Sequence, residues 1–290
     1  MAQTNPYGPL GQPYDTTAYR NASEHAILAV TLLLVFAVIA LTAAATVCLS
    51  VVFVALFVAL AYGATRAQHR ALMAQATPIT QNTAPALSEV VAGCVARLRP
   101  SQVQAFVVPS AVLNAYTFGI TKPHVLVLHS SLLRVMDEDE LRFVVGHELG
   151  HVRLGHTRLN SLIGGMAGIP SPFAASAVLA LAFLWWNRAC EVSSDRAGLL
   201  ACGRLDKAVS ALVKLAAGSD ASSRDGLEQA LRQIEAEDDT PLGALGEVLS
   251  THPMMVRRIE ELRRYAISDE YRRLQPLLAR NEELSTFHVT

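Results

Sequence analysis

The chain has 290 residues, of which 51% are hydrophobic and only 17% are charged, whereas soluble domains carry about 25% charged residues. Its net charge of −1 and its lack of a basic block give no reason to expect nucleic-acid binding. Its four cysteines, Cys48, Cys94, Cys190 and Cys202, are scattered without a C-x-x-C pair. We therefore expect no disulfide framework, and a reducing compartment is favoured.

The N-terminal region divides into a polar and an apolar part. Residues 1–24 are rich in Pro, Gly, Tyr and Asn and lack apolar periodicity, which predicts a disordered polar tail. No charged residue occurs between Ala26 and Thr65. A single helix of that length would span about 60 Å, twice the ~30 Å hydrocarbon core of a bilayer. Two helices near 27–44 and 47–64 fit better.

These two helices form a predicted transmembrane hairpin over residues 25–66, which makes the chain an integral, multi-pass protein of the cell membrane. Both ends of a hairpin lie on the same side of the bilayer. Arg20 precedes the hairpin, and Arg66 and Arg70 follow it. Because cytoplasmic flanks carry an excess of Lys and Arg, we expect the domain formed by residues 67–290 to be cytoplasmic.

The first part of that domain combines one helix with short strands. Residues 86–98 read as a helix that ends before Pro100. Three short apolar runs separated by turn residues follow, at 104–108, 111–118 and 125–128. They predict a small β-sheet next to the helix that comes after it.

That next helix carries a metal-binding pattern. Asp137 and Glu140 have the spacing of a helix capping box, and apolar residues then recur at helical spacing. His147 and His151 lie four residues apart, so they share a helix face and can bind one tetrahedral zinc ion. Glu148 is placed to take a proton from a water activated by the metal. The alternative is a helix with two surface histidines and an unrelated acid.

A catalytic zinc needs a third protein ligand and one open position. Glu191 is the candidate, and Asp195 lies four residues later on the same predicted helix face. One of these acids can bind the metal while the other accepts the ring N–H of a ligating histidine. Taken alone, the two acids would read as part of a solvated helix face.

Together these segments resemble the HtpX-type zinc metallopeptidases, a family that also includes the CAAX prenyl endopeptidase. The resemblance runs from about Leu113 to Leu262. It implies an α+β, mainly helical, zincin-like peptidase domain with a small β-sheet. The motifs that carry it are Asn114-Ala115, Asp137-Glu138-Asp139-Glu140-Leu141, His147-Glu148-Leu149-Gly150-His151, Glu191-x-x-x-Asp195, and Thr251-His252-Pro253 with Arg258 and Ile259.

The resemblance also assigns roles at the centre of the site. It implies one Zn²⁺ per chain bound by His147, His151 and Glu191, with Glu148 as the catalytic base. His252 matches a family histidine beside the active site, which either stabilises the oxyanion or occupies the fourth position of the zinc.

Three further residues receive supporting roles. Asp195 is expected to accept the ring N–H of a ligand histidine, and Arg258 to fix the helix that carries His252. Asn114 is expected on the strand alongside which the substrate lies. His156 follows His151 by five residues, about 140° round a continuous helix, and is left out of the ligand set.

The segment between the metal helices departs from the family pattern. Residues 161–186 contain only about one span of apolar sequence, yet His151 and Glu191 must meet at one metal, so the chain between them crosses the bilayer an even number of times. Two crossings need about 40 apolar residues. The segment is therefore expected to form a shallow membrane-associated hairpin, or to lie buried against the domain and the first two helices. Trp185 and Trp186 suit the membrane interface.

The remaining chain is predicted to be helical at 205–217, 254–266 and 269–284, with a mobile segment at 218–240 over the cleft. The function expected is a membrane-anchored zinc endopeptidase that acts on membrane or misfolded proteins. Two alternatives remain, a peptidase that processes prenylated CAAX proteins and a non-catalytic, zinc-stabilised membrane interaction module. The sequence leaves the oligomeric state open.

Overall fold

The computed structural model describes residues 16–45, 73–159, 161, 174–217 and 253–286, with isolated positions between 51 and 71 and at 226 and 229. The fold is α+β and mainly helical, as expected. Its helical elements are η1 (Thr16–Ala18), α1 (Glu24–Ala45), α3 (Pro85–Leu98), α4 (Leu132–Val135), α5 (Glu138–Leu154), α7 (Ala174–Cys202), α8 (Leu205–Ala217), α11 (Pro253–Ala266) and α12 (Asp269–Thr286).

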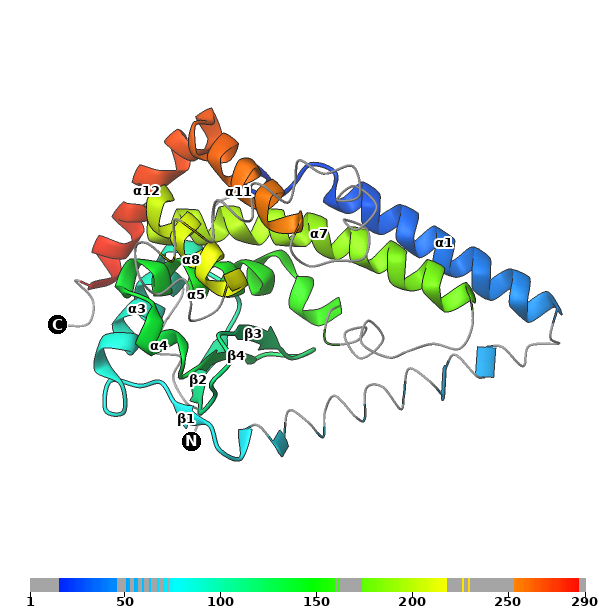
Figure 1. Ribbon diagram of the computed structural model, residues 1–290, viewed down its shortest axis with the longest axis horizontal. Helices are drawn as coiled ribbons and strands as arrows, with labels where there is room; N and C mark the ends of the chain where they lie inside the picture. The colour runs from blue at the N-terminus through cyan, green and yellow to red at the C-terminus, as the bar shows by residue number, and fades with distance from the viewer. Residues whose placement is uncertain are drawn as a thin grey trace.

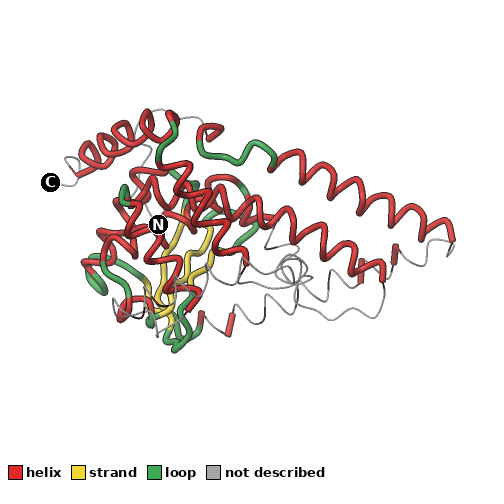
Figure 2. Tube along the Cα trace, turned by 45° about the horizontal axis from the view of Figure 1, so that its top comes forward, coloured by secondary structure: helices red, strands yellow, loops and turns green. Residues whose placement is uncertain are grey.

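A four-stranded sheet lies against one side of the helices (Figures 1 and 2). Its strands follow the order β1-β2-β4-β3. β2 and β4 are parallel, and β3 pairs antiparallel with β4, so β3 forms one edge. The bounds are β1 (Thr77–Pro78), β2 (Val103–Val108), β3 (Ala115–Phe118) and β4 (His124–His129).

The three strands predicted from the sequence are all present. β1 was missed because it has two residues, one of them a proline, inside a polar connection. It pairs antiparallel with β2 at the other edge of the sheet.

Helix α5 begins as the sequence predicts. The Asp137 side chain accepts a hydrogen bond from the backbone N–H of Glu140, and the Glu140 side chain accepts one from the backbone N–H of Asp137. This reciprocal capping satisfies two backbone donors that the helix itself leaves unpaired. Glu140 also accepts from Lys214 of α8 at 2.7 Å in a buried ion pair. The start of α5 is therefore fixed to a second helix.

Small residues bring α5 and α7 unusually close together. A Cβ atom added at Gly146 would lie 2.4 Å from the Cβ of Ala201, and one at Gly150 would lie 2.7 Å from the Cβ of Ala197. Real Cβ atoms do not approach so closely, so both positions require glycine. The contact brings the segment of α5 that carries the histidines against the segment of α7 that carries the acids.

The structure corrects the predicted disordered tail for residues 16–23. Tyr19 is fully buried in the main core, because its ring packs among residues of the helices. Arg20 donates from Nη2 to the carbonyl of Leu154 at 3.1 Å, and the backbone N–H of Asn21 donates to Oγ of Ser193 at 2.9 Å. Residues 1–15 lie outside the described part of the chain.

Helix α1 is the one described helix long and apolar enough to cross a bilayer. Its 22 residues span about 33 Å. Much of its apolar surface is exposed, including Leu33, Phe36 and Leu41, which are 67–72% accessible. A core helix of a soluble domain would bury such side chains. The second predicted membrane helix, 47–64, falls mostly outside the described residues.

Helix α7 runs beside α1 and continues without a break to the metal-binding acids (Figure 1). The predicted hairpin over 161–186 therefore has no turn between Ala174 and Trp186, and most of its earlier part, 162–173, lies outside the described residues. Trp186 is buried against Ile27 of α1 rather than at an interface, because α1 covers it, whereas Trp185 is 54% exposed.

Candidate metal centre

Three donor residues from two helices converge on one point. His147 and His151 lie one turn apart on α5, and Glu191 faces them from α7. Their donor atoms all lie within 4.8 Å of one another. The two Nε2 atoms are 3.1 Å apart, and the Glu191 carboxylate oxygens lie 3.5 Å from Nε2 of His147 and 3.3 Å from Nε2 of His151.

These distances fit a tetrahedral metal ion. Zinc binds histidine nitrogen and carboxylate oxygen at about 2.0–2.2 Å, which places two ligands of one tetrahedron roughly 3.3 Å apart. The three observed separations scatter closely around that value. Among the described residues three protein donors converge here, and a tetrahedral site with three protein ligands keeps a fourth position for water or substrate, as in catalytic rather than structural zinc sites. The residues present therefore fit a catalytic zinc.

Asp195 orients the first of these histidines. Its Oδ1 lies 2.9 Å from Nδ1 of His147, and its side chain is almost completely buried. A proton on Nδ1 then faces Asp195, which leaves the lone pair of Nε2 for a metal. The sequence predicted that one of these acids could bind the metal while the other accepts the ring N–H of a ligand histidine. The structure brings Glu191 to both histidines and Asp195 to His147.

Arg258 links the same two acids from α11. Its guanidinium donates to both Asp195 oxygens at 2.7 Å, and its Nη1 lies 3.0 Å from Glu191. Burial by itself raises the pKa of Glu191, but the Arg258 charge and both histidines outweigh it and hold that pKa well below its usual range. The carboxylate is therefore ionised and ready to bind a cation. The family resemblance had led us to expect Arg258, with Asp195, among the residues that support the ligands, and to expect it to fix the helix that carries His252.

Glu148 follows His147 on α5 and is 8% exposed. It lies near enough to the Arg258 guanidinium for the two charges to interact. Among the predicted residues, Asn114 is exposed and directly precedes β3, and its backbone oxygen accepts from the N–H of His129 on β4 at 3.0 Å. His252 lies outside the described residues.

Sequence reasoning missed a second set of contacts, at His151. Helix α5 ends at Gly155, which has φ +87°, and residues 156–159 are helical again. The assumption of a continuous helix therefore fails, and Nδ1 of His156 lies 3.1 Å from Nδ1 of His151. The glycine directly before His156 was the signal available, since a left-handed glycine commonly ends a helix.

Comparison with known proteins identifies the region that holds these residues. The sequence model of Peptidase family M48 matches residues 78–266. The chain is 34% identical over 184 residues to the plastoglobule-localized metallopeptidase 48, chloroplastic, of Arabidopsis thaliana, a match that covers 58% of this chain and 53% of that protein. This chain thus spans about half the length of that relative.

Bacterial and archaeal relatives are matched over more of their length. The chain is 27% identical over 230 residues to a protease HtpX homolog of Ralstonia nicotianae, covering 69% of this chain and 80% of the relative. It is 24% identical over 236 residues to a protease HtpX homolog of Pyrococcus furiosus, covering 65% and 76%.

Proposed function

The chain belongs to peptidase family M48, and from that premise we propose that it is a membrane-anchored, zinc-dependent endopeptidase. The resemblance to HtpX-type peptidases expected from the sequence is confirmed by the family match and by the named relatives. The observation that carries the proposal is the donor triangle of His147, His151 and Glu191, whose sides of 3.1–3.5 Å fit one tetrahedral zinc.

The side chains of the site would have different roles in peptide hydrolysis. Zinc bound here would supply a Lewis acid that polarises the scissile carbonyl and lowers the pKa of its water. Glu148 takes the proton of the attacking water and then passes a proton to the leaving amine. Asp195 and Arg258 hold the ligands in place. For His252 we propose a position beside the reacting carbonyl, where an imidazole can stabilise the oxyanion or occupy the open position at rest.

The edge strand β3 offers a place for an extended substrate. Within the described residues its strand partner is β4, and it lies last in the strand order, at an edge of the sheet. A peptide that adds to this edge would run beside Asn114 and toward α5, which contacts β3. Such backbone pairing accepts many side chains, which suits a peptidase that acts on misfolded chains.

The bilayer lies close to the metal centre in this proposal. Helix α1 has the length and exposed apolar surface of a membrane span, and Glu24 at its first turn lies two hydrogen bonds away from His151. From Ala174 to Trp186, α7 adds about 18 Å of helix beside α1, too little for a full crossing. We therefore assign membrane or juxtamembrane proteins as substrates and place the domain on the cytoplasmic side.

Replacement of the base tests the mechanism. In the purified full chain, Glu148→Gln is expected to lower the cleavage rate of an unfolded protein by about 10²- to 10⁴-fold, because no carboxylate remains to take the proton. Zinc content should stay at one per chain. Glu138→Gln is the control, since Glu138 lies on the same helix but is 68% exposed and pairs with Arg142 one turn later.

Two results would count against the proposal. Full activity in Glu148→Gln would exclude this residue as the base. One zinc per chain that is lost in His147→Ala, together with no peptidase activity on unfolded, membrane or prenylated substrates, would instead support a zinc-stabilised interaction module.

A further inference from the structure

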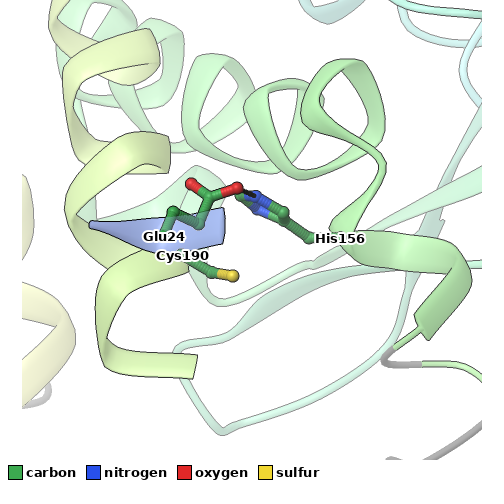
Figure 3. A group of neighbouring side chains, drawn as sticks. All are labelled: Glu24, His156 and Cys190. Carbon is green, nitrogen blue, oxygen red and sulfur yellow. Dashed lines mark hydrogen bonds and ion pairs between the residues drawn. The ribbon is translucent and has the colours of Figure 1, made fainter. Parts of the chain in front are cut away.

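Three buried residues outside the ligand set gather next to the metal centre. Glu24 comes from the first turn of α1, His156 follows the end of α5, and Cys190 precedes Glu191 on α7 (Figure 3). Their potential donor atoms lie within 4.8 Å of one another. Glu24 lies outside residues 78–266, the region matched by the family.

The contacts within this group occupy the atoms that a second metal ion would need. Nε2 of His156 lies 2.9 Å from Oε1 of Glu24. Ser193 donates to Oε2 of Glu24 at 2.6 Å, and Arg20 forms an ion pair with the same carboxylate. A cation at this place would have to displace Arg20 and break the contact between His156 and Glu24. The geometry therefore favours a hydrogen-bond network over a second metal site.

The donors and acceptors of this network have a fixed direction. With its Nε2 bound to a metal, His151 would carry its proton on Nδ1, which lies 3.1 Å from Nδ1 of His156. His156 must accept there and therefore carries its own proton on Nε2, which donates to the Glu24 carboxylate. Only one arrangement of protons satisfies all three side chains.

We propose that Glu24 and His156 form a hydrogen-bonded relay that holds His151 in its metal-binding orientation and so ties the metal centre to the start of helix α1. Both are positioning residues, because neither touches the metal or the substrate. The proposal rests on the zinc site proposed above. The relay provides His151 with a hydrogen-bond partner for the ring nitrogen that does not face the metal, as Asp195 does for His147. Partners of this kind set ligand orientation and basicity.

Through Glu24, the relay connects the metal centre to the packing of helix α1. Glu24 opens α1, and Ile27 one turn later packs against Trp186 and Cys190 of α7. The ring of Trp186 in turn lies edge-on to that of His156, with centroids 6.0 Å apart. A displacement of α1 in the membrane would therefore change the contacts of His156 and, through it, of His151.

Paired substitutions in the detergent-solubilised full chain test the relay. Glu24→Gln keeps an acceptor for His156, whereas Glu24→Met removes it, and both lose the ion pair with Arg20. We expect zinc affinity, measured by competition with a chelator, to fall about 10- to 100-fold in Glu24→Met and clearly less in Glu24→Gln. His156→Gln, which can accept and donate at once, should likewise retain more affinity than His156→Phe.

Two controls separate positioning from general loss of stability. Thr31→Val removes a buried side-chain hydrogen bond within α1, to the carbonyl of Ile27, without touching the relay. His124→Phe removes a buried histidine whose ring is hydrogen-bonded to the Gly119 carbonyl, outside the relay. Both should bind zinc as the unsubstituted protein does. The visible spectrum of the cobalt-substituted protein should change in Glu24→Met and His156→Phe, because it reports the geometry of the ligands.

The possible results of these measurements distinguish failure of the relay from failure of the metal centre. Unchanged zinc affinity and cobalt spectrum in Glu24→Met would overturn the relay, and so would two zinc ions per chain that fall to one in this variant, since that would mean a second metal site. If His147→Ala kept its zinc, the proposed metal centre itself would fail. Loss of zinc in His147→Ala with no effect of Glu24→Met would overturn the relay alone.

Discussion

At the scale of single residues, the metal centre depends on the side chains that contact the metal ligands from the side away from the metal. Nδ1 of His147 faces Asp195, Nδ1 of His151 faces His156, and Arg258 spans Asp195 and Glu191. The two acids lie close together, with Asp195 almost fully buried and Glu191 partly exposed, and like charges repel more strongly there than in bulk water. Arg258 offsets that repulsion before any metal binds.

Removal of Arg258 should therefore destabilise the metal-free protein more than the zinc-loaded one. We expect Arg258→Met to cost about 3–5 kcal/mol without metal, because it leaves the buried charge of Asp195 without its guanidinium partner. Thermal unfolding with and without a chelator measures the difference. Arg257→Met is the matched control, since Arg257 is the exposed neighbour on α11. Equal destabilisation by both variants would contradict this role of Arg258.

At the scale of elements, the site is a contact between two helices. Helix α5 supplies both histidines and α7 supplies both acids, and the glycines at 146 and 150 allow the helices to approach closely. Gly150 lies inside the metal-binding motif itself, next to His151. The motif thus carries a packing requirement as well as ligands, which its spacing alone does not reveal.

An added methyl group at this contact should separate the ligands. Gly150→Ala is expected to cost about 1–3 kcal/mol of stability through overpacking and to weaken zinc binding, because its Cβ would meet that of Ala197. The double variant Gly150→Ala with Ala197→Gly removes the clash and should regain part of the zinc affinity. Zinc competition assays on the two variants and on Ala197→Gly alone measure this. Additive effects would contradict direct contact as the cause.

At the scale of the whole molecule, the start of α1 joins the proposed membrane helix to the metal centre. Tyr19, Arg20 and Asn21 fix the chain before α1 to the peptidase domain. The exposed apolar side chains of α1 lie farther along the helix, away from these contacts. If α1 spans a bilayer as proposed, the metal centre would lie at the bilayer surface, on the side where α1 begins.

Charges placed on the exposed face of α1 test this arrangement. The double variant Leu33→Arg and Phe36→Arg should reduce the fraction of protein retained in membranes after alkaline extraction, because each charge at the helix centre costs about 2.5–3.5 kcal/mol. Ile267→Arg is the control, since Ile267 is equally exposed but lies between α11 and α12. Unchanged retention would argue against α1 as an anchor.

A cysteine at exposed Gln75 should react with an impermeant reagent only from the cytoplasmic side.

The sequence by itself determined the local features of this protein. Helical spacing and the Asp137–Glu140 capping box located α5, and the four-residue spacings paired His147 with His151 and Glu191 with Asp195. Such features depend on neighbours within one or two turns of a helix, so the amino-acid sequence alone is enough to predict them. The three main strands followed from apolar runs between turn residues for the same reason.

Only the tertiary structure decided which distant groups support the site. Arg258 reaches both acids from α11, and Glu24 reaches His156 from a segment that reads as a disordered tail. The turn at Gly155 moved His156 from the far side of a supposed helix to the ring of His151. The contacts of Arg258 with Asp195 and of Glu24 with His156 join residues 63 and 132 positions apart. They form because the packing of α1, α5, α7 and α11 brings these buried polar groups together away from water.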